Sequence, residues 1–179
     1  VLPDWRAAGA PVLLASAAAT ASSPDTVATR LGKAVHRLLE WATAPGADAA
    51  DADLMATLAE GAAREHGAVP AEVLRLARRI LGSAEAARFF AGPALHWAGN
   101  EVPVAEGGEA LRIDRLVALR EGDALVWWVL DYKLSHAPQE LAAYRDQLQR
   151  YGRAVALAQP GVVVRAAFIT GSGAVVEPG

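Results

Sequence analysis

The sequence predicts an α/β domain in which a mixed central sheet is flanked by helices. Three observations point to this fold class. Apolar residues recur at helical spacing through the first half of the chain, strand-like segments follow after Gly92–Pro93, and a long amphipathic pattern separates the last two strands. The expected order is helix, helical insert, three strands, helix and strand, which is typical of one mixed domain.

The helical half begins with a helix that we expect to start near the capping segment Ser23–Asp25 and to end at Pro45–Gly46. A helical insert is predicted over residues 51–91. Gly67 and Pro70 interrupt its apolar pattern, so the insert should contain at least two helices.

The second half carries the predicted strands, which cover 94–104, 111–119, 125–133 and 162–170. We expect the first of them to be broken near Gly99–Asn100. An amphipathic helix is predicted over 138–158, with an apolar stripe formed by Leu141, Tyr144, Leu148, Tyr151 and Val155. Adjacent strand residues point to opposite faces, so the pair Trp127–Trp128 predicts a central strand with apolar cover on both sides.

The composition is that of a folded domain, which we place at residues 25–179 after a linker or lead-in over 1–24. The chain is 53% apolar with a mean hydropathy of +0.20, which excludes an intrinsically disordered protein. It contains no cysteine, which excludes disulfides and any iron–sulfur cluster held by cysteine. No apolar run reaches the roughly 18 residues of a membrane helix, and a cytoplasmic location is expected.

A predicted hairpin brings two carboxylates together. If Gly122–Asp123 forms its two-residue turn, Asp114 lies directly opposite Asp131 on the same side of the sheet. Like charges in facing positions destabilise a sheet, and carboxylates in a partly buried region need a partner. A divalent cation between the two carboxylates removes the repulsion and gives each of them a partner. A bulge at Trp127–Trp128 would change the register of this hairpin.

Lys133 follows Asp131 by two residues, so both side chains point to the same face of the strand. The chain uses arginine for nearly all its basic residues, and Lys33 is the other lysine. A compact ammonium group beside paired acids can stabilise charge that develops on a phosphate. The triplet Asp131-Tyr132-Lys133 could equally stand at a solvated strand end. The facing Asp114 is the observation that favours a catalytic site.

Two helices supply further candidate residues. His36 lies on the first helix, where a neutral imidazole is a common metal ligand and an ordinary surface histidine is the alternative. Gln147 and Tyr151 are four residues apart and share one face of the later helix. Tyr151 also fits the apolar stripe as a core residue, whereas the Gln147 amide requires hydrogen-bond partners.

Four short motifs in this order resemble the RecB-type branch of the PD-(D/E)xK nuclease superfamily. They are Gly32-x3-His36-x2-Leu39-Glu40, Ile113-Asp114-Arg115, Leu130-Asp131-Tyr132-Lys133 and Gln147-x3-Tyr151. The order and spacing are similar to those of the C-terminal nuclease domains of RecB and AddA helicase–nucleases, over about residues 26–170.

The resemblance implies a role for each matched residue. His36, Asp114 and Asp131 would bind Mg²⁺ or Mn²⁺, with the Tyr132 backbone carbonyl as a further ligand. Lys133 would be the catalytic lysine, and Gln147 and Tyr151 would support the site or the DNA strand. Glu101, in the strand before the hairpin, is an additional candidate.

The function that follows is metal-dependent hydrolysis of DNA, in single-stranded form, by a bacterial nuclease domain of exonuclease type. The resemblance implies that a helicase, in the same parent chain or in a partner subunit, acts with it in double-strand break repair and recombination. The alternative is a catalytically silent module that positions DNA or docks a protein. The net charge of −3 mildly favours docking, because DNA-binding modules usually have a basic surface.

Overall fold

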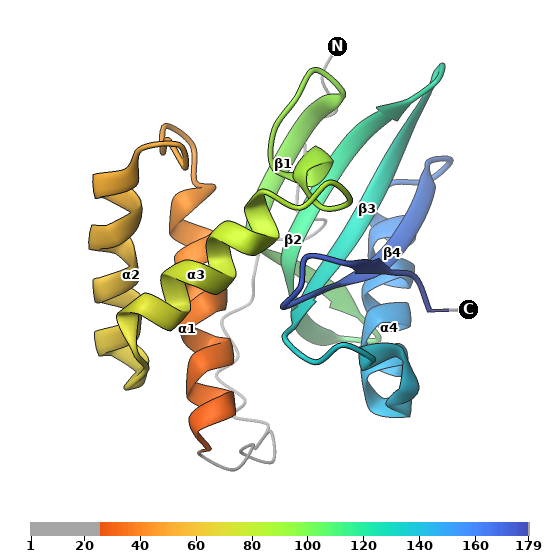
Figure 1. Ribbon diagram of the computed structural model, residues 1–179. Coiled ribbons are helices and arrows are strands. Elements are labelled where there is room, and N and C mark those ends of the chain that lie inside the picture. Colours follow the sequence, from red (N-terminus) through yellow and green to blue (C-terminus); the bar gives the residue numbers. More distant parts are fainter. Residues whose placement is uncertain (1–25, 179) are drawn as a thin grey trace.

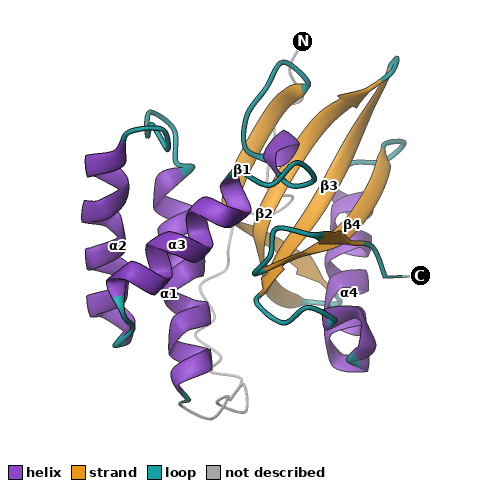
Figure 2. Cartoon of the chain, viewed as in Figure 1, coloured by secondary structure: helices purple, strands orange, loops and turns teal. Residues whose placement is uncertain are grey.

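The computed structural model describes residues 26–178, which form helices around one five-stranded sheet (Figures 1 and 2). The helices are α1 (Val27–Ala42), α2 (Ala52–His66), α3 (Pro70–Leu81) and α4 (Ala142–Ala158), with short 3-10 turns η1 (Ala87–Phe89) and η2 (Pro138–Glu140). The strands are β1 (Leu95–Glu106), β2 (Glu109–Glu121), β3 (Ala124–Lys133), β4 (Val163–Thr170) and β5 (Val175–Val176).

The sheet has the spatial order β1-β2-β3-β4-β5 and mixes both kinds of pairing. Strands β1, β2 and β3 are antiparallel neighbours, β3 and β4 are parallel, and β5 runs antiparallel to the end of β4. The α/β class with a mixed sheet is therefore confirmed. In the part of the chain that the structure describes, no helix is long and apolar enough to cross a bilayer.

Helices cover both faces of the sheet. The three helices α1, α2 and α3 lie together on one side, and α4 lies on the other (Figure 1). Trp128 belongs to the core on the α1–α3 side and Trp127 to the core on the α4 side, and neither is exposed to solvent. The predicted central strand is confirmed by this pair, and no bulge interrupts β3 there.

The ends of the early helices follow local capping rules. The predicted capping segment Ser23–Asp25 lies outside the described residues, and Thr26 caps α1 by accepting a hydrogen bond from the Thr29 amide. The helical insert divides where predicted. Gly67 ends α2 in the left-handed region with φ 66°, and Pro70 occupies the first turn of α3, where a missing amide hydrogen costs nothing.

Two expectations for the second half are corrected. Strand β1 is not broken at Gly99–Asn100, since both residues pair with β2. Its register shifts between Leu95 and Trp97, and Glu101 has a positive φ of 51°. The helix predicted from residue 138 begins at Ala142, because Pro138 starts a separate 3-10 turn and Leu141 has extended backbone. Leu141 is consequently 52% exposed and does not belong to the apolar stripe.

Both hairpins have two-residue turns. Gly107 and Gly108 connect β1 to β2 with positive φ at both positions, which only glycine adopts without cost. Gly122 begins the turn between β2 and β3 with φ 59°, and Glu121 pairs with Ala124 beside it. The predicted register of the second hairpin is confirmed from this pair up to Arg115 and Leu130.

Candidate active site

Three neighbouring strands each contribute one acidic residue to a row across the sheet. The paired residues Asn100–Arg115 and Val102–Ile113 flank Glu101 and Asp114, so these two acids occupy facing positions. Asp131 follows Leu130, whose partner Arg115 is next to Asp114. The Tyr132 amide then donates a hydrogen bond to Asp114 Oδ2 at 3.0 Å, which fixes that carboxylate beside β3.

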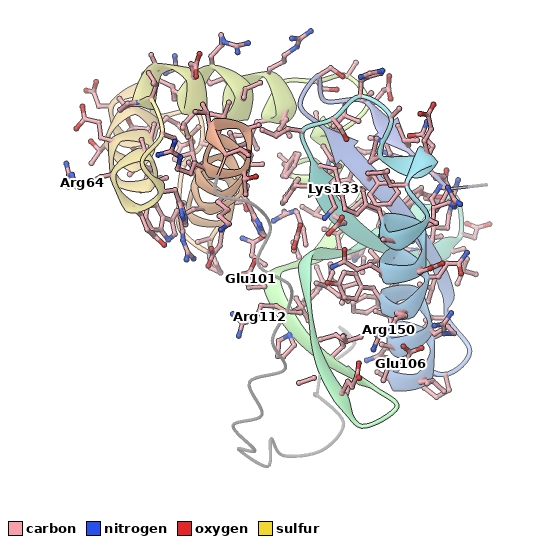
Figure 3. All side chains as sticks on the ribbon, turned by 90° about the horizontal axis from the view of Figure 1, so that it is seen from below. Arg64, Glu101, Glu106, Arg112, Lys133 and Arg150 are labelled. Atoms are coloured by element: carbon pink, nitrogen blue, oxygen red, sulfur yellow. The ribbon has the colours of Figure 1, made fainter. Side chains whose placement is uncertain are left out.

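His36 brings α1 to this row. Its Nε2 atom lies 2.8 Å from Glu101 Oε1 and 3.8 Å from Asp114 Oδ1. His36, Glu101 and Asp114 each offer one ligand atom, and these atoms all lie within 4.8 Å of one another. In Figure 3, Glu101 lies between α1 and the β1–β2 hairpin.

This donor set fits a divalent cation. Oxygen ligands suit Mg²⁺ and Mn²⁺, and a neutral imidazole is a common transition-metal ligand. Two ligand atoms at right angles around a cation, each about 2.1 Å from it, are about 3 Å apart. The 2.8 Å separation between His36 Nε2 and Glu101 Oε1 is close to that spacing.

Asp131 and Lys133 lie next to this group on the side of α4. The Asp131 side chain is 3% exposed, and its Oδ2 atom lies 2.7 Å from Lys133 Nζ. The ammonium group also stands over the ring of Tyr144, 4.7 Å from its centre. Asp131 is therefore a neighbour of the His36–Glu101–Asp114 group and already has a cationic partner.

Burial raises the pKa of both aspartates of the row above the ordinary value. Burial raises the pKa of Asp114 to about 6. Burial and the charge of Asp114 raise the pKa of Asp131 to about 7. Burial lowers the pKa of His36, which favours the neutral imidazole that a metal requires. Glu101 and Asp131 have Arg112 and Lys133 as ionic partners, at 3.5 Å and 2.7 Å. A bound dication would stabilise the ionised forms of the two buried aspartates.

The pKa of Lys133, on the cationic side of the site, shifts in the direction that favours its charged form. Burial alone would lower the pKa of Lys133, but the charge and hydrogen bond of Asp131 together raise it above its ordinary value. Lys133 is consequently charged at neutral pH. Its side chain is 20% exposed, and its ammonium group lies next to the acid row.

Gln147 and Tyr151 lie on the face of α4 that packs on the sheet. The Gln147 side-chain amide donates a hydrogen bond to the Tyr151 hydroxyl at 2.7 Å. Tyr151 is buried in the core on the α4 side, and burial raises the pKa of its hydroxyl, with the charges of Asp131 and Asp114 acting in the same direction. The pair is thus within electrostatic reach of the acid row. The expected role of the Tyr132 backbone carbonyl as a metal ligand stays a prediction.

Glu101 is more central to the site than the motif resemblance implies. The signal that would have identified it is the Gly107–Gly108 pair, a favoured hairpin turn. Applying to this turn the register argument used for Gly122–Asp123 places Glu101 opposite Asp114. The positive φ of Glu101 has no signal in the sequence, because residues other than glycine rarely adopt it.

A buried arginine behind the row was also missed as a structural residue. Arg115 is 1% exposed, and its guanidinium donates hydrogen bonds to Asn100 Oδ1 at 2.6 Å and Thr43 Oγ1 at 2.9 Å. Its Nε atom donates to the Phe89 carbonyl at 3.0 Å. The Asn100 amide in turn bonds the Glu40 carbonyl at 2.9 Å, so this network joins the end of α1 to β1 and β2.

Comparison with known protein families gives a match over most of the chain. The model of the PD-(D/E)XK nuclease superfamily matches residues 13–174, which include the acid row, His36, Lys133, Gln147 and Tyr151. No curated protein matches the chain. The match covers most of the 179 residues, and the mixed sheet between helices is consistent with that fold. The chain therefore belongs to the PD-(D/E)XK nuclease superfamily.

Proposed function

We propose that this chain is a metal-dependent DNA nuclease domain that hydrolyses phosphodiester bonds. The observation that carries the proposal is the acid row Glu101–Asp114–Asp131, with His36 on one side and Lys133 on the other. Membership of a nuclease superfamily supports the same reaction class. A docking module has no need for three neighbouring acids beside a charged lysine.

The residues divide into metal-binding and substrate-facing groups in this proposal. His36, Glu101 and Asp114 would hold the cation, with Asp131 and the Tyr132 carbonyl as further ligands. The cation, Mg²⁺ or Mn²⁺, would supply Lewis acidity for phosphodiester hydrolysis. The Lys133 ammonium would stabilise negative charge developing on the phosphate, at a point that Asp131 and the Tyr144 ring fix.

Gln147 and Tyr151 would support this arrangement from α4. Their mutual hydrogen bond orients the tyrosine hydroxyl, which remains free to donate a further hydrogen bond. A position next to the acids suits either a carboxylate or a phosphate oxygen as the acceptor. Both residues thus serve as positioning groups for the site or for the DNA strand.

The finer proposal is a RecB/AddA-type exonuclease domain, occupying residues 25–179, that receives single-stranded DNA from a helicase. Four motifs in the RecB order support it, and each of them has residues at or behind the acid row. Its role would be double-strand break repair and recombination in the bacterial cytoplasm. The net charge of −3 suggests weak intrinsic affinity for DNA, which a helicase that delivers the strand would offset.

The test is cleavage of labelled single-stranded DNA with Mg²⁺ or Mn²⁺ by the chain and by Asp131→Ala and Lys133→Ala. The proposal expects metal-dependent cleavage by the parent chain and loss in both variants. Absence of both cleavage and calorimetric metal binding in the parent chain would favour a docking module. Metal binding without cleavage would support a competent site that requires its helicase.

A further inference from the structure

A pocket of about 200 Å³ adjoins the acid row on the side of α1. It opens between α1, the end of α2 and β1, and it is lined by Lys33, His36, Arg37, Glu40, His66 and Glu101. His36 and Glu101 are common to this pocket and to the candidate metal-binding group. A molecule in the pocket would therefore reach directly to the acid row.

The charged groups of the pocket wall are largely paired with one another. Arg37 bonds Glu40 at 2.6 Å and Glu65 at 2.9 Å, and Glu101 contacts His36. Lys33 is exposed and makes no ion pair or hydrogen bond within residues 26–178. Lys33 is thus the cation of this wall that has no partner among residues 26–178.

The position of Lys33 relates this cation to the proposed reaction. Lys33 precedes His36 by three residues on α1, so their Cβ atoms are about 5–6 Å apart. Lys133, the other lysine of the chain, lies across the acid row on the side of α4. A strand that passes over the row would meet one ammonium group on each side of it.

We propose that this pocket is a phosphate subsite for a nucleic-acid strand and that Lys33 is its cation. The inference rests on the proposed nuclease function and adds the path of the substrate to it. An ammonium group binds phosphate as a point charge and requires no particular orientation of the strand. The ligand class is a phosphate group next to the scissile one, within the backbone or at a strand end.

The test measures binding of a fluorescent single-stranded oligonucleotide by anisotropy, in EDTA and over a series of salt concentrations. Lys33→Ala should weaken binding roughly fivefold to tenfold at low salt. The slope of log K against log salt should fall in magnitude by about 0.7, the value for one phosphate contact to a single strand. Lys33→Arg should restore most of the affinity. Arg75→Ala is the matched control, because Arg75 is an exposed cation on α3 outside the pocket.

Three oligonucleotides distinguish the two sources of the phosphate. An equal loss with circular, 5′-hydroxyl and 5′-phosphorylated strands assigns an internal backbone phosphate. A loss confined to the phosphorylated strand assigns a terminal phosphate. Either result supports a phosphate subsite.

An unchanged slope in Lys33→Ala, an equal change in Arg75→Ala, or no measurable DNA binding by the parent chain would overturn the subsite. Binding in EDTA does not depend on hydrolysis. A parent chain that shows the Lys33 effect but neither binds Mn²⁺ nor cleaves DNA would contradict the proposed function and leave the subsite standing.

Discussion

The Lys133 ammonium group lies 2.7 Å from the Asp131 carboxylate, two residues before it on β3. This ion pair links the acid row to the cation that would face a substrate phosphate. Because Asp131 is almost fully buried, the pair fixes Lys133 more firmly than a surface pair would. We expect Asp131 to contribute to the metal site and Lys133 to catalysis.

Lys133→Ala should lower kcat for DNA cleavage by about 100-fold or more, because a group that stabilises transition-state charge is removed. The variant should still bind Mn²⁺ at least as tightly as the parent chain, since a positive charge beside the acids is gone. Steady-state kinetics and calorimetry check the two parts. Loss of Mn²⁺ binding together with activity would show that Lys133 maintains the site and does not act on the substrate.

Stability should depend on pH through Asp114 and Asp131. Their pKa values in the folded protein, about 6 and about 7, exceed the ordinary value of 3.8. Raised values mean that the folded state holds these protons more tightly, so their stabilising contribution is complete below pH 3.8 and is lost as pH rises through 6 and 7. A bound dication compensates the ionised forms, so Mn²⁺ should raise Tm more at pH 7.5 than at pH 5. Thermal unfolding with Mn²⁺ or EDTA measures this, and an equal shift at both pH values would contradict it.

Glu101→Gln should weaken Mn²⁺ binding by about tenfold or more, because it removes a ligand charge while keeping the side-chain shape. Glu109→Gln, an exposed change in the same hairpin, is the control and should leave the affinity unaltered. Calorimetry on both variants provides the comparison. Equal affinities would remove Glu101 from the metal-binding group.

Arg115→Met should lower the free energy of unfolding by about 3 kcal/mol, because it leaves the buried acceptors on Asn100, Thr43 and Phe89 without a donor. Arg112→Met, at a 68% exposed position on the same strand, should change it by less than about 0.5 kcal/mol. Urea unfolding measures both. If Arg115→Met lowered the free energy of unfolding as little as Arg112→Met does, the network behind the acid row would add little to the stability of the fold.

Local sequence rules were sufficient for the sheet around the site. A two-residue turn at Gly122–Asp123 fixes the register of β2 and β3, so the approach of Asp114 to Asp131 follows from counting residues. The Trp127–Trp128 pair likewise identifies a strand buried on both faces. These features depend on contacts between residues close in sequence.

The contribution of α1 could not be predicted in the same way. His36 reaches Glu101 and Asp114 because α1 packs against the sheet, and that placement involves the contacts of Thr43 and Arg115 between residues far apart in sequence. The motif resemblance indicated His36 as a ligand without giving any distance. The left-handed conformation of Glu101 could not be predicted either, because residues other than glycine rarely adopt it.

The most direct measurement is a calorimetric titration of Mn²⁺ into the parent chain and into Asp114→Asn, the substitution at the centre of the acid row. We expect saturable binding by the parent chain and loss of that binding in the variant. Binding should release protons near pH 6.5, because the cation lowers the raised pKa values of Asp114 and Asp131. Equal Mn²⁺ binding by the two proteins, or none by either, would contradict a metal centre at Glu101, Asp114 and His36.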